Sequence, residues 1–124
     1  MSFAVFVLTV FSVTLSACAQ IMLKFGMSAP SVRAALAGSD MLAKVQAVAF
    51  SPFVVGGLAV YFLGALVWLT VLSRIDVSQA YPFVGMGFVL TLLFAWLFLG
   101  EHISASRLFG ASLILAGIVF VARS

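Results

Sequence analysis

PFVVGGLAVYFLGALVWLTVL, the stretch from Pro52 to Leu72, carries no charged side chain and is apolar almost throughout. A helix that crosses the hydrocarbon core of a bilayer needs about 20 predominantly apolar residues. The apolar residues here are continuous, whereas the strands of a membrane β-barrel alternate apolar and polar residues. Because lipid offers no partner for backbone polar groups, this stretch predicts a membrane-spanning helix.

Three further stretches have the same character. They run from about Phe3 to Leu23, from about Val77 to Leu99 and from about Ser104 to Ala122. Only short polar connections separate the last three spans, so neighbouring spans there must be antiparallel. We therefore predict an all-α integral membrane protein with four transmembrane helices, in a single transmembrane domain over residues 1–124.

The composition fits this class and excludes others. Of 124 residues, 65% are hydrophobic and only 7% are charged, against about 25% charged in soluble domains. Six basic residues spread along the chain form no nucleic-acid-binding patch. The single cysteine excludes an internal disulfide, and no His/Cys cluster has metal-ligand spacing. No nucleophile–base pair is recognisable, so we expect no enzymatic activity, no metal and no other cofactor.

The connection between the first two spans is the only long one. Its segment 30–49 mixes apolar residues with charged ones, and Pro30 is suited to begin a helix that Gly38 interrupts. We expect a short amphipathic helix lying on the membrane surface.

Basic residues give a weak topology signal. One side of the membrane carries four basic residues, namely Lys24, Arg33, Lys44 and Arg107. The other side carries two, Arg74 and Arg123. The excess of positive charge favours both termini outside the cytoplasm, with inverted or dual insertion left open.

The first span contains a polar stripe. Ser12, Ser16, Gln20 and Lys24 recur every four residues and therefore share one helix face. Polar groups are costly against lipid tails, so the stripe should face another helix or a hydrated cavity. In a simpler interpretation the two serines bond back to their own helix and Lys24 extends to the interface.

The third span begins with Ser78-Gln79-Ala80-Tyr81-Pro82. Pro82 lacks a backbone donor, so a helix bend and a freed carbonyl are expected one turn into the span. The alternative is a helix that proline initiates, with Tyr81 in the aromatic belt at the interface.

The fourth span carries small residues on one face, namely Ser106, Gly110 and Gly117. Small residues let helices approach closely in lipid, so this face predicts packing or dimerisation.

No Asp, Glu or His lies in the centre of any span. A proton-driven exporter generally needs a carboxylate there, so its absence argues against such an exporter.

Three segments resemble the drug/metabolite transporter superfamily, which includes the EamA-like and small-multidrug-resistance-like proteins. The segment AQIMLK (19–24) is similar to its first-helix signature, and WLTVLSRIDVSQAYP (68–82) to its second junction. The pattern FLGEHIS (98–104), followed by Gly110 and Ala116-Gly117-Ile118, is similar to its closing motif. Order and length resemble the small four-helix members, above all subunits of the undecaprenyl-phosphate-aminoarabinose flippase.

One departure separates the chain from the related small multidrug exporters. Those carry a membrane-embedded glutamate eight residues before the lysine of the first helix, where this chain has Ser16. The resemblance therefore implies the lipid-sugar branch. The alternatives are a small-multidrug-resistance-like exporter of small cations or metabolites, and a non-transporting membrane assembly subunit.

What the resemblance implies is a flippase in the bacterial inner membrane, in lipid A and lipopolysaccharide modification. It would translocate a lipid-linked sugar such as undecaprenyl-phosphate aminoarabinose between leaflets. Ser16, Gln20 and Tyr81 are then candidates to bind the sugar, and Lys24 and Arg74 to attract the phosphate. A chain this small is expected to form a homodimer, or a heterodimer with a similar transporter subunit.

Overall fold

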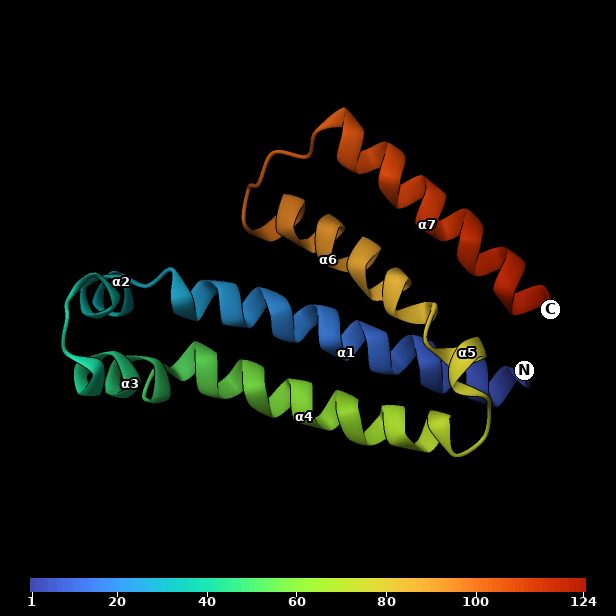
Figure 1. The fold of residues 1–124 in the computed structure, drawn as a ribbon, viewed down its shortest axis with the longest axis horizontal. Coiled ribbons are helices and arrows are strands. Elements are labelled where there is room, and N and C mark those ends of the chain that lie inside the picture. The colour runs from blue at the N-terminus through green and yellow to red at the C-terminus, as the bar shows by residue number, and fades with distance from the viewer.

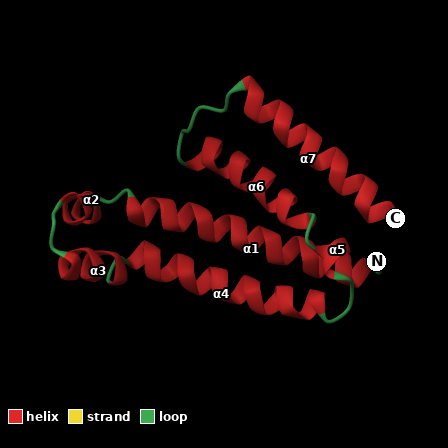
Figure 2. Cartoon of the chain, in the orientation of Figure 1, coloured by secondary structure: helices red, strands yellow, loops and turns green.

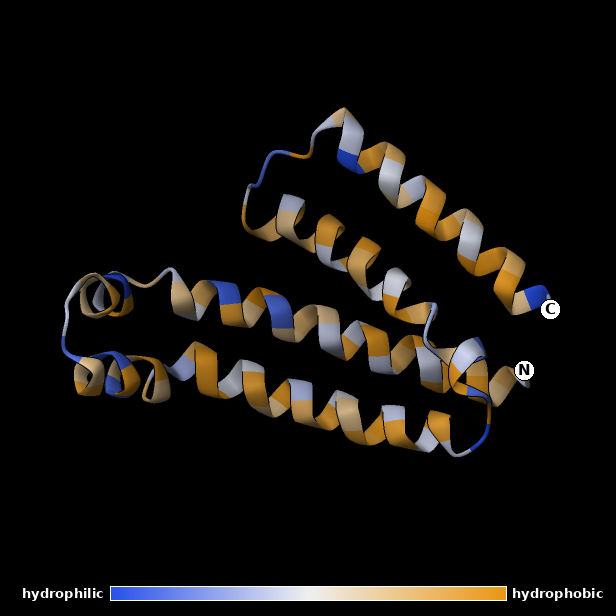
Figure 3. Cartoon of the chain, in the orientation of Figure 1, coloured by the Kyte–Doolittle hydropathy of each residue, from blue (hydrophilic) through white to orange (hydrophobic).

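The computed structural model describes all 124 residues, which form helices and no strands (Figures 1 and 2). Four segments are long and apolar enough to cross a membrane. They are α1 (Phe3–Met27), α4 (Pro52–Leu72), α5 with α6 (Val77–Phe98) and α7 (Ala105–Arg123). The predicted all-α class with four membrane-spanning helices is confirmed. Figure 3 shows that hydrophilic residues gather mainly in the connections and near the helix ends.

The long helices pack in a row rather than in a closed bundle. α1 packs against α4 on one side and against α6 on the other, and α7 packs against α6. Both termini lie at the same end of the molecule (Figure 1). The buried share of the apolar window falls from 39% in α1 to 11% in α7. α1 is therefore the central helix of this chain, and α7 is its most exposed one.

Glycines hold α1 and α4 in close contact. A Cβ atom at Gly26 would lie 2.6 Å from Val54 Cγ2 and 2.8 Å from the Val54 nitrogen. A Cβ atom at Gly64 would lie 3.3 Å from the carbonyl oxygen of Ser12. The hydrophobic effect does not drive helices together in lipid. Small residues promote helix association there because they let the backbones approach closely and pack.

The third span is interrupted at Tyr81 and Pro82, the position of the predicted bend. α5 (Val77–Ala80) is a single turn, and α6 (Phe83–Phe98) begins after the break. The Tyr81 N–H bonds to the Val77 carbonyl and the Val84 N–H to the Tyr81 carbonyl, but no backbone hydrogen bond joins α5 to α6. The missing N–H of proline thus divides the span into two helices.

Two short helices, rather than one, fill the connection between α1 and α4. α2 (Pro30–Ala37) begins at its proline and ends at Gly38, and α3 (Met41–Ala49) begins after Asp40. The Asp40 carboxylate accepts a hydrogen bond from the Leu42 N–H at 3.1 Å, which caps α3. The pair lies beyond the ends of α1 and α4, at the opposite end of the molecule from the termini (Figure 1).

α1 is longer than the sequence suggested. The predicted span ended near Leu23, but the helix continues to Met27, where the Ser28 N–H bonds to the carbonyls of Lys24 and Gly26. Lys24 therefore lies in the last turn of α1 and not in a loop.

Candidate functional site

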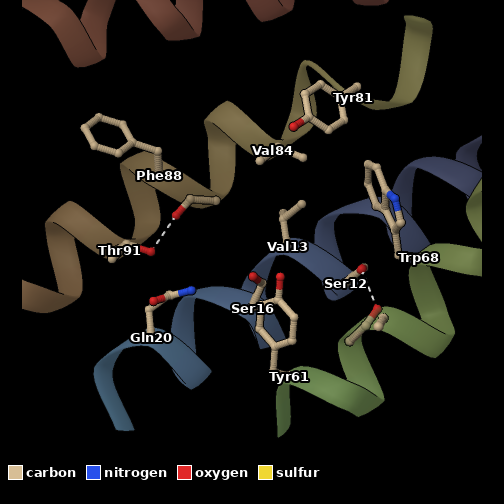
Figure 4. A pocket seen from close by; sticks show the side chains of 13 residues that line it. Ser12, Val13, Ser16, Gln20, Tyr61, Trp68, Tyr81, Val84, Phe88 and Thr91 are labelled. Carbon is tan, nitrogen blue, oxygen red and sulfur yellow. Dashed lines mark hydrogen bonds between the residues drawn. The ribbon is translucent and has the colours of Figure 1, made fainter. Parts of the chain in front are cut away.

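A cavity of about 500 Å³ lies between α1, α4 and the first half of α6 (Figure 4). This volume falls in the range of small-molecule sites, about 300–1,000 Å³. The residues that line the cavity are Ser12, Val13, Ser16, Gln20, Tyr61, Gly64, Ala65, Trp68, Tyr81, Val84, Gly87, Phe88 and Thr91.

Two polar side chains of the cavity wall are engaged within the chain. The buried Ser12 hydroxyl donates to the Gly64 carbonyl oxygen at 2.8 Å, and the Thr91 hydroxyl donates to the Gly87 carbonyl oxygen at 2.8 Å. The Ser12 bond joins α1 to α4. The interpretation in which Ser12 bonds back to its own helix is therefore wrong, because its hydroxyl bonds to Gly64 of α4, where the two helices approach closely.

Besides the indole N–H of Trp68, four other polar side chains line the cavity without a hydrogen bond to the rest of the chain. They are Ser16, Gln20, Tyr61 and Tyr81. Figure 4 shows the hydroxyls of Ser16 and Tyr61 directed into the cavity, with Tyr81 entering from the far wall. These groups can donate to and accept from a polar ligand.

The sequence-predicted residues fall into two sets. Ser16, Gln20 and Tyr81 line the same cavity, although Tyr81 is far from the other two in sequence. Lys24 and Arg74 do not line it. Lys24 lies in the last turn of α1, whereas Arg74 follows α4 at the other end of the helix pair, so the two cations lie toward opposite membrane faces.

Two polar lining residues were missed by sequence reasoning. Tyr61 and Thr91 each lie inside an apolar run that identified only a span, and Trp68 entered only through the family resemblance of segment 68–82. Their orientation depends on how α4 and α6 are rotated against α1. A tyrosine in the middle of an apolar span was the one available signal, because a phenol hydroxyl in lipid requires a polar partner.

Aromatic rings form much of the wall. Tyr61, Trp68, Tyr81 and Phe88 all line the cavity. No carboxylate, histidine, lysine or arginine does so. The cavity therefore offers hydroxyls, one amide and the negatively polarised faces of aromatic rings, without a formal charge.

The polar stripe of α1 becomes more exposed along the helix. Ser12 is buried, Ser16 is half-buried, and Gln20 and Lys24 are exposed on the surface of the chain. An exposed amide against lipid tails is costly. The cavity is thus incompletely enclosed at its Gln20 end.

The small residues of α7 take no part in this cavity. A Cβ atom at Gly110 or Gly117 would meet no other atom within 4 Å, and Ser106 is exposed. In contrast, a Cβ atom at Gly85 of α6 would lie 2.6 Å from Ile114 Cγ2. The α7 face that bears Ser106, Gly110 and Gly117 is therefore not used for packing within the chain.

The chain is similar to one relative over nearly its whole length and to others over about half of it. The chain is 32% identical over 122 residues to the "Uncharacterized protein y4nH" of Sinorhizobium fredii, with 97% of each chain covered. It is 41% identical over 61 residues to a "Probable 4-amino-4-deoxy-L-arabinose-phosphoundecaprenol flippase subunit ArnE" of Pseudomonas fluorescens, and 42% identical over 62 residues to one of Pseudomonas aeruginosa. These two matches cover 49% and 50% of this chain and 54% of each relative, about half the length of the flippase subunits. No solved structure matches significantly.

The family is defined by a match over nearly the whole chain. Residues 1–123 match the EamA-like transporter family. Three of the four membrane-spanning segments surround the cavity with its polar and aromatic walls, and α7 packs outside it. The chain is accordingly a small, multi-pass membrane protein that belongs to the EamA-like transporter family.

Proposed function

We propose that this protein is a transporter subunit that moves the headgroup of a lipid-linked sugar phosphate between the leaflets of the bacterial inner membrane. The transported lipid is an undecaprenyl-phosphate sugar such as aminoarabinose. The observation that carries the proposal is the cavity in which Ser16, Gln20, Tyr61 and Tyr81 present unengaged polar groups inside the membrane-spanning region. The flippase names of the partly matching relatives point in the same direction.

A lipid-linked substrate suits a cavity that is open to one side. The polyprenyl tail remains in the bilayer, so only the sugar phosphate needs a polar path. Gln20 lies at the exposed end of that path and Ser16 deeper within it. Each sugar hydroxyl then exchanges water for a hydroxyl or amide of the wall, which offsets the cost of its dehydration.

The aromatic wall favours an amino sugar. The rings of Tyr61, Trp68 and Tyr81 present faces that attract a cation without neutralising it. A carboxylate in the same place would bind the ammonium group more tightly and slow its release. The uncharged wall is therefore suited to passage rather than to retention.

Lys24 and Arg74 serve opposite leaflets in this proposal. They lie toward opposite ends of the α1–α4 pair and outside the cavity. A compact ammonium or a guanidinium at the interface attracts a phosphate from its own leaflet. One cation then receives the phosphate that the other has released.

A second subunit completes the path. The exposed Gln20 and the unused small-residue face of α7 both require a neighbour in lipid. We infer a homodimer, or a heterodimer with a similar small transporter subunit, that forms through Ser106, Gly110 and Gly117. The complex transports its substrate and catalyses no covalent change.

Reconstitution in liposomes tests the proposal. The purified chain, alone and with a related small subunit, should move a labelled undecaprenyl-phosphate sugar across the bilayer, and Gln20→Ala should slow this movement about tenfold, as expected for one lost polar contact. Thr70→Ala is the matched control, because the Thr70 hydroxyl is exposed and bonds to Leu66 of its own helix. Absence of movement in both preparations contradicts the proposal.

The aromatic wall also favours a second candidate, the export of a small organic cation or metabolite. It predicts a proton flux in liposomes that the cation stimulates. The wall has no carboxylate to carry a proton, which argues against cation export.

A third candidate is a membrane subunit that only assembles with a partner and does not transport. In that case Gln20→Ala and Lys24→Ala leave the activity of the complex intact.

A further inference from the structure

A second concave surface lies away from the cavity, between α3 and the beginning of α4. It has a volume of about 530 Å³. Its wall includes Leu36 of α2, Val45 and Val48 of α3, and Val54 and Leu58 of α4, and its only charged residue is Lys44. We refer to it as the α3–α4 groove. An apolar surface with one ammonium group is complementary to an amphiphile with a single negative head.

The groove begins at the membrane surface and continues into the bilayer. α2 and α3 connect two membrane-spanning helices, so they lie at the membrane face where α4 enters. Val54 and Leu58 belong to the first two turns of α4 and lie one turn apart, about 6 Å along the axis. A chain that follows this wall therefore runs parallel to α4, in the direction of the acyl chains of one leaflet.

The end of the molecule that bears the groove has a net positive charge. Lys24, Arg33 and Lys44 are the basic residues of segment 24–51, and Asp40 is its only acidic residue. The Asp40 carboxylate is engaged with the Leu42 N–H. The uncompensated charge is positive, and basic residues beside a membrane attract anionic lipids.

We propose that the α3–α4 groove binds an anionic glycerophospholipid, with one acyl chain against α4 and its phosphate beside Lys44. Burial of the chain confers little preference, because the tail leaves an equally apolar solvent. Selection therefore comes from the head charge. The bound lipid fixes α2 and α3 to one leaflet, and this role does not depend on the transported substrate.

Photoactivatable lipids test the proposal in the full chain. The protein is reconstituted in bilayers that contain traces of phosphatidylglycerol or phosphatidylcholine with a diazirine in one acyl chain, and labelled residues are mapped by mass spectrometry. Phosphatidylglycerol should label Val45, Val48 and Leu58 in preference to phosphatidylcholine. Lys44→Gln should reduce this preference about fivefold, the factor expected for one basic side chain near a membrane surface.

Matched variants separate the groove from general attraction. Arg33→Gln removes a charge from the same segment outside the groove, and the preference should stay within about twofold of the native chain. Leu58→Trp should block labelling, whereas Leu69→Trp, at an exposed site far along α4, should not. Equal labelling by both lipids overturns the proposal, as does labelling spread evenly over the exposed apolar residues.

Two further outcomes identify a different occupant and also overturn the proposal. Competition by undecaprenyl phosphate stronger than by phosphatidylglycerol assigns the groove to a polyprenyl lipid. Labelling that increases as the protein is diluted in the bilayer assigns the groove to a second copy of the chain. Size-exclusion profiles and helical circular dichroism equal to those of the native chain establish that each variant is folded.

Discussion

α1 and α7 are nearly equal in apolarity and opposite in their surroundings. The apolar windows of the two helices have mean hydropathies of 2.0 and 1.9, yet α1 packs against two long helices and α7 against one. The polar stripe of α1 begins at a buried serine, whereas the small residues of α7 face open space. Average apolarity thus decides that a helix enters the membrane, while the placement of polar and small residues decides what it contacts.

Replacement of Gly26 by leucine should cause the largest change, because it separates α1 from α4. Even a Cβ atom there would lie 2.8 Å from the backbone nitrogen of Val54, which cannot rotate away. We expect a loss of about 1–3 kcal/mol in the free energy of unfolding, measured by thermal or denaturant unfolding in detergent. Gly117→Leu on α7 is the control, and an equal loss there contradicts the comparison.

Leucines at Gly110 and Gly117 together should leave the fold intact and weaken association. A Cβ atom at either position meets nothing within the chain, so only a partner can be displaced. The dissociation constant in the bilayer should rise about tenfold, the scale of small-residue helix packing. Single-molecule counting of labelled subunits measures it, and an unchanged dimer fraction would mean that α7 is not the interface.

Lys24→Gln should weaken capture of the lipid-linked sugar about fivefold, since one basic side chain at the surface is lost. The measurement is the amount of labelled lipid that half-saturates transport in liposomes. Arg107→Gln removes a charge from the same side of the membrane, at the beginning of α7, and should have little effect. Equal effects would show that general surface charge, and not the α1 stripe, attracts the substrate.

Ser12→Ala should have the smallest effect. The variant loses the 2.8 Å hydrogen bond to the Gly64 carbonyl, and such bonds between membrane helices average about 0.6 kcal/mol. The free energy of unfolding measures the loss. Ser112→Ala is the control, because its exposed hydroxyl bonds to Leu108 of the same helix and no interhelical contact is lost.

The fold was predictable wherever a local pattern determines structure. Continuous apolar runs identified the spans, and Pro82 marked the interruption of the third one. The connection was less predictable. Pro30 and Gly38 indicated one helix, but a second begins at Met41 because Asp40 supplies its cap.

The cavity was predictable only in part. The four-residue spacing placed Ser16 and Gln20 on one face of α1. Which residues of α4 and α6 face them depends on interhelical contacts such as Ser12 with Gly64, which are 52 residues apart. Tyr61 and Thr91 therefore became visible only in the assembled structure, and the separation of Lys24 from Arg74 followed from the antiparallel course of α1 and α4.

The interruption at Tyr81 and Pro82 has a mechanical consequence. α5 is held in place, because Ala80 is fully buried in a cluster with Val5 and Val71. α6 can tilt about the break as a lever without rupturing any backbone hydrogen bond to α5. Its 16 residues extend about 24 Å, so a tilt of about 10° displaces the far end by about 4 Å. A small rotation about a pivot at one membrane face would thus change the aperture near Gln20.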